Sequence, residues 1–313
     1  MFAPPGRLWN AAQMKILVTG SRGFVGNRLV PHLKGAGHTV AGFDRDTVDV
    51  SDSEAVSAFV RASSPDAVVH LAAIAFVPSA AQDPNLAHRV NVEGTRNVIE
   101  AVEAHAPGAR LLLIGSGDQY PPQAPGAPPL SEETALAPLG VYAETKAAAE
   151  ELGHAAAHAG LDIVRVRAFN HTGPGQSPNF VAPDFARQIA RIEAGDGAPM
   201  RVGNLESVRD FLHVDDVIEA YRQLIDPGVP SGVYNVSSGV GTRIGELLES
   251  LAAMAGVEPE ILRDEARWRP ADARVGSYQR LQQATGWKPL HTLDETLKAV
   301  LDDWRARIHA QGA

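Results

Sequence analysis

Short apolar runs alternate with helical patterns over the first half of this chain. Five runs are typical of buried strands, at residues 15–20, 38–44, 66–73, 109–116 and 162–169. Helical spacing separates them, at residues 24–34, 53–63, 84–105 and 141–158. Strands that alternate with helices predict an α/β fold whose parallel sheet is covered on both faces. Right-handed crossovers make such a sheet doubly wound.

The first strand runs into a glycine-rich turn, "TGSRGFVG", with Gly20, Gly23 and Gly26. Glycines there let the backbone turn tightly and approach a pyrophosphate at the helix N-terminus. Such spacing also arises by chance, so its place between a strand and a helix carries the interpretation. Asp44 ends the second strand, where a carboxylate accepts hydrogen bonds from ribose hydroxyls and favours NAD. Arg22 and Arg45 can pair with a 2′-phosphate and favour NADP, so both cofactors stay open.

A second group of residues points to acid–base chemistry. "YAETK" places Tyr142 and Lys146 four residues apart, on one face of a helix. A free tyrosine titrates near ~10, and we expect the Lys146 ammonium to lower the pKa of Tyr142. Ser116 ends the fourth strand, where its hydroxyl can hydrogen-bond a substrate carbonyl. Each of the three residues alone has an ordinary structural explanation. All three at one edge of the sheet indicate a catalytic site far more specifically.

Composition narrows the class of protein. Hydrophobic residues make up 44% of the 313 residues and charged residues 21%, as in a folded globular protein. The net charge of −9 argues against binding to nucleic acid or to an anionic membrane. The absence of cysteine excludes disulfides and thiolate chemistry. With neither a signal peptide nor an apolar run of ~20 residues, we expect a cytoplasmic protein.

The alternation breaks down after Asn170, which suggests a second unit. A helix near residues 183–194 and short strands follow, and "GVYNVSS" returns to the strand pattern. We therefore expect a dinucleotide-binding domain at 14–170, rejoined by about 208–236. Residues 171–313 would mainly form a smaller mixed α/β substrate-binding domain over the carboxyl edge of the sheet. Residues 1–13 are predicted to be a flexible extension.

These motifs make the chain resemble the extended short-chain dehydrogenase/reductase family of nucleotide-sugar enzymes, over about residues 14–304. The segments that carry the resemblance are the three glycines, Asp44, "DVSD" at 49–52, "HLAA" at 70–73, Asn91 in "NVEGT", Ser116, Tyr142, Lys146 and "VRDFLHVDD" at 208–216. The resemblance implies a Rossmann-type sheet, a nicotinamide cofactor, NAD(P)H, and a nucleoside-diphosphate-sugar substrate. It also implies a homodimer that forms through the helices holding Asn91 and Tyr142.

The resemblance assigns site residues as well. The catalytic residues would be Ser116, Tyr142 and Lys146, and Asp49 and Val50 would contact the adenine. The cofactor contacts would come from Gly20, Gly23, Phe24, Val25, Gly26, Asp44, Arg45, Asp49, Val50, Leu71, Ala72, Ala73, Asn91, Tyr142 and Lys146. The substrate contacts would come from Ser116, Asp118, Asn170, Asn179, Val181, Arg187, Arg209 and Arg269. Arginines at 209 and 269 suit a diphosphate, because it needs fixed cationic donors.

The loop "NHTGPGQSPNF" refines the substrate. Its prolines and glycines exclude a helix or a central strand. By itself it is either a connector or the wall of a site. It resembles the matching region of the subgroup that reduces GDP-4-keto-6-deoxy-D-mannose. The sequence departs from the family at "GSGDQYP", where Asp118 stands in place of the usual Glu and Pro121 in place of Gly. The shorter carboxylate makes dehydration at C5 and C6 less favourable, and the same change departs from the Glu that the reductases usually carry.

Three functions follow from these observations. The first is NAD(P)H-dependent reduction of the C4 keto group of a GDP-4-keto-6-deoxyhexose. The second is an NAD-dependent nucleotide-sugar epimerase or 4,6-dehydratase, which keeps its cofactor through the cycle. The third is a dinucleotide-binding sensor without catalysis. No metal is expected, because a helix N-cap with an acidic first turn explains His213, Asp215 and Asp216.

Overall fold

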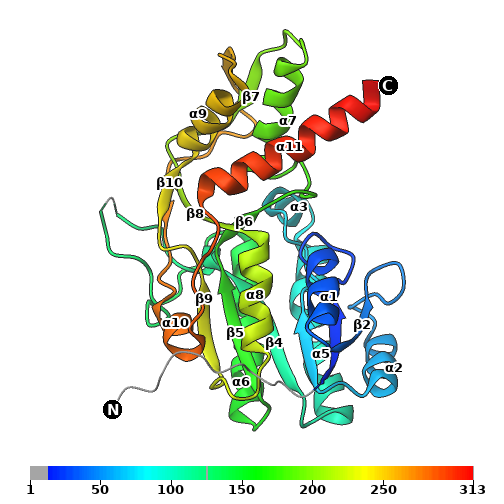
Figure 1. Ribbon diagram of the computed structural model, residues 1–313. Coiled ribbons are helices and arrows are strands. Elements are labelled where there is room, and N and C mark those ends of the chain that lie inside the picture. The colour runs from blue at the N-terminus through cyan, green and yellow to red at the C-terminus, as the bar shows by residue number, and fades with distance from the viewer. Residues whose placement is uncertain (1–12, 125, 313) are drawn as a thin grey trace.

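A six-stranded parallel sheet forms the centre of the molecule (Figure 1). The computed structural model describes residues 13–124 and 126–312, so residues 1–12 of the predicted extension lie outside the described part. The strand order is β2-β1-β3-β4-β5-β9, and every neighbouring pair is parallel. The strands are β1 (Lys15–Thr19), β2 (Thr39–Phe43), β3 (Ala67–His70), β4 (Arg110–Ser116), β5 (Ile163–Ala168) and β9 (Gly232–Val236). The predicted doubly wound sheet is confirmed.

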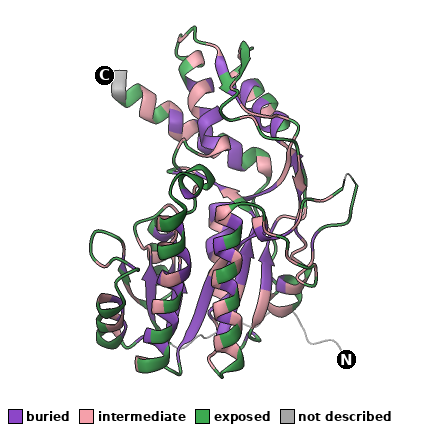
Figure 2. Cartoon of the chain, turned by 180° about the vertical axis from the view of Figure 1, so that it is seen from behind, coloured by how far each residue is buried: buried purple, intermediate pink, exposed green. Residues whose placement is uncertain are grey.

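Helices cover both faces of this sheet, and each face has its own core. On one side, apolar residues of the strands pack with α1 (Gly26–Gly35), α8 (Val214–Leu224) and α10 (Gln279–Thr285). On the other side they pack with α2 (Ser53–Ser63), α5 (Gly94–His105) and α6 (Val141–His158). Figure 2 shows the strands buried and the outer faces of the helices exposed. Because both faces are covered, the strands are continuous apolar runs, as their sequences indicate.

A smaller unit lies over the carboxyl ends of the strands (Figure 1). It contains α7 (Val181–Glu193), α9 (Ile244–Ala255) and α11 (Leu293–Gly312), which share a separate core. Two small sheets complete this unit. In one sheet β6, β10 and β12 pair with β8, and in the other β7 pairs with β11. The strands are β6 (Asn170–Thr172), β7 (Met200–Val202), β8 (Val208–His213), β10 (Gly241–Arg243), β11 (Ile261–Arg263) and β12 (Ala273–Arg274).

Three local features differ from the sequence prediction. The first three residues of the loop at 170–180 form β6, which pairs with β8, so a turn-rich segment still contributes a short strand. The helix expected at 84–105 is α4 (Pro84–His88), a π-helical turn (Arg89–Glu93) and α5 in succession. A further helix, α3 (Val77–Gln82), precedes it. Within the described residues, no helix is both long and apolar enough to span a membrane.

The strand order reverses at β1, which has β2 on one side and β3 on the other. Open α/β sheets bind ligands at such a switch point, outside the carboxyl ends of the strands. The segments that leave β1 and β3 are the glycine turn and the "LAA" segment after His70. They touch, because a Cβ placed on Gly20 would lie 2.9 Å from the backbone nitrogen of Ala72.

Candidate active site

The glycine turn after β1 has the geometry of a phosphate cradle. Gly20 has a φ of +68°, a backbone conformation that other residues rarely adopt. A Cβ on Gly26 would lie 2.3 Å from the Gly20 carbonyl oxygen, so only glycine lets α1 start so close to the turn. Val25 precedes α1 without a side-chain cap, and the first turn has no acidic residue. An uncapped helix N-terminus with no carboxylate beside it suits a pyrophosphate.

The residues that would meet the adenosine ribose lie at the end of β2. The Asp44 carboxylate is held by Arg22, whose Nη2 donates to Oδ1 at 2.7 Å and whose Nε donates to Oδ2. This pairing is the main reason that the pKa of Asp44 is lowered. Arg22 also pairs with Asp46 at 2.8 Å, whereas Arg45 is exposed. A ribose diol would compete with Arg22 for the Asp44 carboxylate, and a 2′-phosphate would compete with Asp44 for the Arg22 guanidinium. The geometry therefore leaves the choice between NAD and NADP open.

The predicted adenine contacts have local structural roles as well. Asp49 Oδ1 accepts hydrogen bonds from the backbone and the hydroxyl of Ser51, and these bonds lower the pKa of Asp49. Val50 is buried, and its carbonyl accepts a hydrogen bond from Asn97. Both residues lie in the segment between β2 and α2. Their contacts with the adenine stay a prediction.

A buried histidine fixes the segment that follows β3. Thr95 donates its hydroxyl proton to the Asn91 carbonyl at 2.7 Å, so it must accept from Nε2 of His70 at 3.0 Å. The Nδ1 of His70 then accepts from the Thr19 hydroxyl, which in turn accepts from the Ala72 amide at 3.1 Å. Burial lowers the pKa of His70 to about 3. The imidazole is therefore neutral, and it ties β1, β3 and α5 together beside the cradle.

Asn91 joins the same segment to the catalytic helix. Its Oδ1 accepts from the Ile74 amide at 2.8 Å, and its Nδ2 donates to the Thr145 hydroxyl at 3.0 Å. Asn91 lies in the π-helical turn that the sequence pattern does not reveal. Such turns are frequent at functional sites because they re-aim side chains. The structure gives Asn91 a positioning role between Ile74 and α6, while direct contact with the cofactor stays a prediction.

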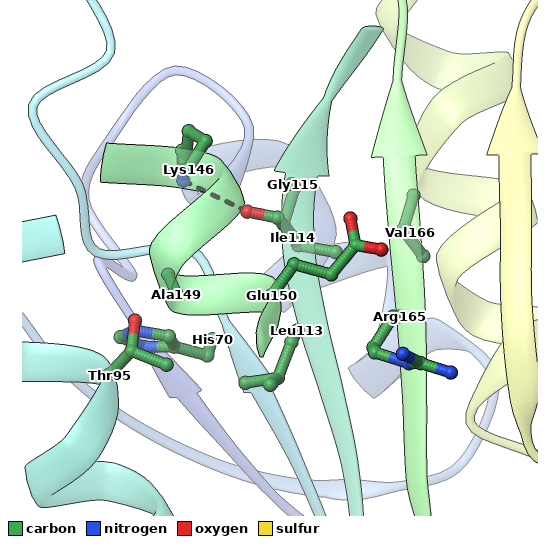
Figure 3. Close-up of a pocket in the computed structure, with 10 residues that line it drawn as sticks. All are labelled: His70, Thr95, Leu113, Ile114, Gly115, Lys146, Ala149, Glu150, Arg165 and Val166. Atoms are coloured by element: carbon green, nitrogen blue, oxygen red, sulfur yellow. Dashed lines mark hydrogen bonds between the residues drawn. The ribbon is translucent and has the colours of Figure 1, made fainter. Parts of the chain in front are cut away.

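The three predicted catalytic residues meet at the ends of β4 and α6. Ser116 is the last residue of β4 and is buried, and its Oγ accepts from the Asp118 amide at 3.1 Å. Tyr142 is the second residue of α6, and a hydrogen bond from Ser116 acts to lower the pKa of its phenol. Lys146 follows one turn later and donates from Nζ to the Ile114 carbonyl at 2.9 Å. Figure 3 shows this bond from α6 to β4.

The pKa of Tyr142 is raised to about 12, and the expectation that Lys146 lowers it is wrong for this structure. Burial of the phenol is the main cause, the negative charge of Asp118 adds to it, and the Ser116 hydroxyl opposes it. Burial also lowers the pKa of Lys146 to about 8. The Lys146 ammonium is directed to a carbonyl on β4, so it does not offset the burial of the phenol. Tyr142 thus holds its proton at neutral pH.

A small internal cavity of about 10 Å³ lies behind Lys146 (Figure 3). Its lining includes His70, Thr95, Lys146, Glu150 and Arg165. It holds at most one water molecule, so it is no substrate site. Glu150, which lines the cavity together with Lys146, forms a buried ion pair with Arg167.

The predicted substrate arginines have different settings. Arg209, on β8, donates from Nη2 to Asp272 at 2.6 Å, and 20% of its side chain is exposed. Arg269 instead donates to the carbonyls of Ala266 and Trp268, within its own turn. Among the described residues, no hydrogen bond or ion pair joins these two arginines. Arg187 pairs with the buried Asp184, and its Nε has no partner among the described residues.

Sequence reasoning missed Arg274, which lies beside Arg209 in the pairing of β12 with β8. Its Nη1 is 2.5 Å from Asp272 and 3.9 Å from Asp118, and its Nε donates to the Tyr120 carbonyl. Arg274 thus connects the predicted diphosphate residue to the acid beside Tyr142. The only sequence signal was its position two residues after "RPAD".

The loop at 170–180 joins the two parts of the molecule. Asn170 begins β6 and is exposed, and Asn179 is exposed beside Val181, the first residue of α7. The His171 ring stacks on Phe24 of the glycine turn, with ring centroids 6.3 Å apart. This loop therefore lies against the cofactor cradle rather than on an unrelated surface, and the substrate contacts of Asn170, Asn179 and Val181 stay predictions.

His213 is the N-cap of α8, as the sequence predicts. Its Nδ1 accepts a hydrogen bond from the Asp215 amide at 3.1 Å, and Asp215 and Asp216 lie in the first turn of α8. His213, Asp215 and His291 lie close enough together to face one ion. A metal at Nδ1 would break the cap, and Asp215 is paired with Arg28 at 3.0 Å. The cap and this ion pair account for the arrangement.

A dinucleotide cradle at the switch point, with a buried Ser and Lys and a partly buried Tyr beside it, defines an NAD(P)-dependent oxidoreductase of the extended short-chain dehydrogenase/reductase type. The chain belongs to the NAD dependent epimerase/dehydratase family, whose model matches residues 16–237.

Individual relatives cover nearly the whole chain. It is 40% identical to the GDP-6-deoxy-D-mannose reductase of Pseudomonas aeruginosa, over 95% of this chain and 99% of that protein. It is 29% identical to the GDP-6-deoxy-D-talose 4-dehydrogenase of Aggregatibacter actinomycetemcomitans, over 87% of this chain and 92% of the relative. The structure of the RMD of Pseudomonas aeruginosa complexed with NADPH matches with a TM-score of 0.86 and 39% identity, over 94% of this chain and 100% of the other. The UDP-glucose 4-epimerase of Thermus thermophilus in complex with NAD matches with a TM-score of 0.83 and 30% identity, over 93% and 99%.

Proposed function

We propose that this enzyme reduces the C4 keto group of a GDP-4-keto-6-deoxyhexose to a GDP-6-deoxyhexose such as GDP-D-rhamnose. The observation that carries the proposal is the arrangement of Ser116 at the end of β4 and Tyr142 in the first turn of α6, where the Ser116 hydroxyl acts on a protonated phenol. A ketone that accepts a hydride must also receive a proton, so a protonated phenol suits the reductive direction. The Pseudomonas aeruginosa reductase at 40% identity supports the choice of substrate.

The residues divide the work in the following way. The nicotinamide cofactor, when bound, supplies the hydride that forms the new C–H bond at C4. Tyr142 donates its proton to the C4 oxygen. The Ser116 oxygen already accepts from the Asp118 amide, so its own proton is free for the same C4 oxygen. The role of Lys146 in stabilising the phenolate that remains rests on the resemblance, because its ammonium faces the Ile114 carbonyl in this structure.

Substrate recognition is assigned to the smaller unit above the sheet. Arg209 is the best placed cation for the diphosphate, because Asp272 fixes its guanidinium while one edge stays exposed. Arg269 is also assigned to the diphosphate. Arg187 and the backbone near Asn179 and Val181 are assigned to the nucleotide, and Asn170 to a further contact with the substrate. These assignments rest on the resemblance and on the position of this unit over the carboxyl edge.

The alternative is an epimerase or a 4,6-dehydratase, and the relatives include UDP-glucose 4-epimerases such as that of Mycolicibacterium smegmatis at 28% identity. Both reactions begin when a base removes a proton from a sugar hydroxyl. The higher identity to the GDP-6-deoxy-D-mannose reductase of Pseudomonas aeruginosa, 40% against 28%, favours the reductase.

One incubation separates these functions. The protein is mixed with freshly made GDP-4-keto-6-deoxymannose and either NADH or NADPH, and the product is identified by NMR. The proposal expects one nicotinamide oxidised per sugar reduced, and the coupling between the C3 and C4 protons distinguishes rhamnose from its C4 epimer, 6-deoxytalose. A protein that retains NAD and turns over nucleotide sugars without net consumption is an epimerase or a dehydratase instead.

We also propose a homodimer that forms through α5 and α6. Asn91 lies in the π-helical turn that leads into α5, and Tyr142 lies in α6. Both helices cover the same face of the sheet. Sedimentation equilibrium of the purified chain tests this, and a monomer at micromolar concentration would contradict it.

A further inference from the structure

A glutamine side chain holds the backbone of Ser116. Gln119 closes the short helical turn that follows β4 (Gly117–Gln119) and is fully buried. Its Oε1 accepts from the Ser116 amide at 2.6 Å, while the Ser116 hydroxyl accepts from the Asp118 amide. The two side chains cap the turn reciprocally, so the position of the Ser116 hydroxyl depends on Gln119.

The far end of Gln119 fixes which way its amide faces. Its Nε2 donates to Glu150 Oε2 at 2.6 Å, and a carboxylate only accepts. The oxygen must therefore face the Ser116 amide, and a flipped amide would lose both bonds. Gly115 leaves room for this arrangement, because a Cβ there would lie 2.5 Å from Gln119 Oε1.

Glu150 is itself held by a buried arginine. Arg167, on β5, donates from Nη2 to Glu150 Oε1 at 2.6 Å, and both side chains are only 7% exposed. Arg167 also donates to the Tyr120 hydroxyl at 2.8 Å, and Tyr120 donates to Asn235 on β9. Such a fully bonded ion pair is rigid, because moving either charge leaves the other buried and unpaired.

Glu150 also lies on the catalytic face of α6. Tyr142, Lys146 and Glu150 are spaced four residues apart, so all three project from one side of the helix. The chain of contacts from Glu150 through Gln119 to Ser116 therefore links the helix that carries the proton donor to the strand that carries the hydroxyl. It fixes the two catalytic groups relative to each other.

We propose that Gln119 is a positioning residue for Ser116, anchored by the Glu150–Arg167 ion pair. The proposal rests on the proposed function, because that function gives the Ser116 hydroxyl its task at the C4 oxygen. A displacement of about 1 Å in a catalytic group can lower turnover by roughly 100-fold. Gln119 thus affects turnover only through Ser116, and not through cofactor binding.

A double-mutant cycle tests this pathway. Gln119→Met keeps the length of the side chain and removes both hydrogen bonds. We expect it to lower kcat by about 10- to 100-fold in the wild-type background. In the Ser116→Ala background the same change should cost less than about 2-fold, because the hydroxyl that it positions is gone. NADPH binding, followed by fluorescence, should be unchanged in all four proteins.

Gln123→Met is the matched control. Gln123 is partly buried in the following loop and makes two hydrogen bonds, to the Pro128 carbonyl and from the Val275 amide, but none to Ser116. We expect it to change kcat by less than about 2-fold in either background. Thermal unfolding of each variant identifies any loss that comes from a destabilised fold.

Hydrogen exchange of the Ser116 amide gives a readout that needs no substrate. In Gln119→Met this amide loses its acceptor and should exchange at least about 10-fold faster, while Gln123→Met should leave it unchanged. Equal losses of kcat in both Ser116 backgrounds, or unchanged exchange at Ser116, would overturn the proposal. A wild-type protein that does not reduce the keto sugar would contradict the proposed function, and the exchange measurement would still decide whether Gln119 holds Ser116.

Discussion

Replacing Lys146 with methionine should make the protein more stable while removing its activity. Only 8% of the Lys146 residue is exposed, and burial lowers the pKa of its ammonium from 10.5 to about 8. Each unit of pKa corresponds to about 1.4 kcal/mol, so keeping this charge in the folded protein at pH 7 costs about 3 kcal/mol. Methionine has a similar length and no charge, and it therefore removes this cost.

The Lys146→Met variant also loses a hydrogen bond. The bond from Nζ to the Ile114 carbonyl at 2.9 Å disappears, which costs about 1 kcal/mol. The net expectation at pH 7 is a gain of about 2 kcal/mol in the free energy of unfolding. For a chain of 313 residues, this gain corresponds to a rise in Tm of about 3 °C.

The dependence on pH makes the test sharper. The folded-state pKa lies below the unfolded value, so the cost is complete below about pH 8 and disappears as pH rises to 10.5. At pH 9.5 the remaining cost is about 1.4 kcal/mol, which nearly equals the lost hydrogen bond. The stability difference between variant and wild type should therefore shrink by about 2 kcal/mol between pH 7 and pH 9.5.

Urea unfolding at the two pH values, monitored by circular dichroism, measures this difference. Lys34→Met is the control, because Lys34 is exposed at the end of α1, and its effect should stay within about 0.5 kcal/mol at both pH values. A Lys146→Met variant that is less stable than wild type at pH 7, or a difference that does not change with pH, would refute the reasoning.

Three further predictions concern activity. Tyr142→Phe should lower kcat at least ~100-fold and leave NADPH binding unchanged in a fluorescence titration, and near-normal turnover would exclude Tyr142 as the proton donor. If the enzyme prefers NADPH, Arg22→Ala should raise the KM for NADPH by about 10-fold and leave the KM for NADH unchanged, because only the 2′-phosphate needs the cation. An equal increase in the KM for both cofactors would contradict this prediction. Arg209→Met should raise the KM for the nucleotide sugar at least about 10-fold, while Arg269→Met, whose guanidinium is held within its own turn, should have the smaller effect; the reverse order would reassign the diphosphate.

The sheet and the catalytic group were predictable because both depend on local patterns. Each strand is a short apolar run, and the parallel arrangement follows from the helices between the runs. Tyr142 and Lys146 share a helix face by spacing alone. Ser116 reaches them because carboxyl ends of parallel strands lie at one edge of the sheet. None of these steps needs a contact between residues that are distant in the sequence.

The remaining features depend on such distant contacts. The π-helical turn that holds Asn91 has no composition signal, because its residues are compatible with an ordinary helix. Arg209 and Asp272 are 63 residues apart, and Tyr120 and Asn235 are 115 apart. Nothing in the sequence showed that Gln119 folds back on Ser116, because the two residues before it, a glycine and an aspartate, are typical of an ordinary turn.

The direction of the Tyr142 pKa shift shows the same limit at the centre of the site. The spacing of Tyr142 and Lys146 indicates that the two groups lie near each other, but the sign of the shift depends on where each charge faces and how deeply it is buried. Lys146 faces a carbonyl of β4, while Asp118 acts on the phenol, so the pKa rises. Asp118 is also the position at which the sequence departs from its family. Its carboxylate lies 3.9 Å from Arg274, which moderates a charge that would otherwise raise the Tyr142 pKa further. The carboxylate that departs from the Glu of the family thus also raises the pKa of Tyr142 and helps to keep its proton in place.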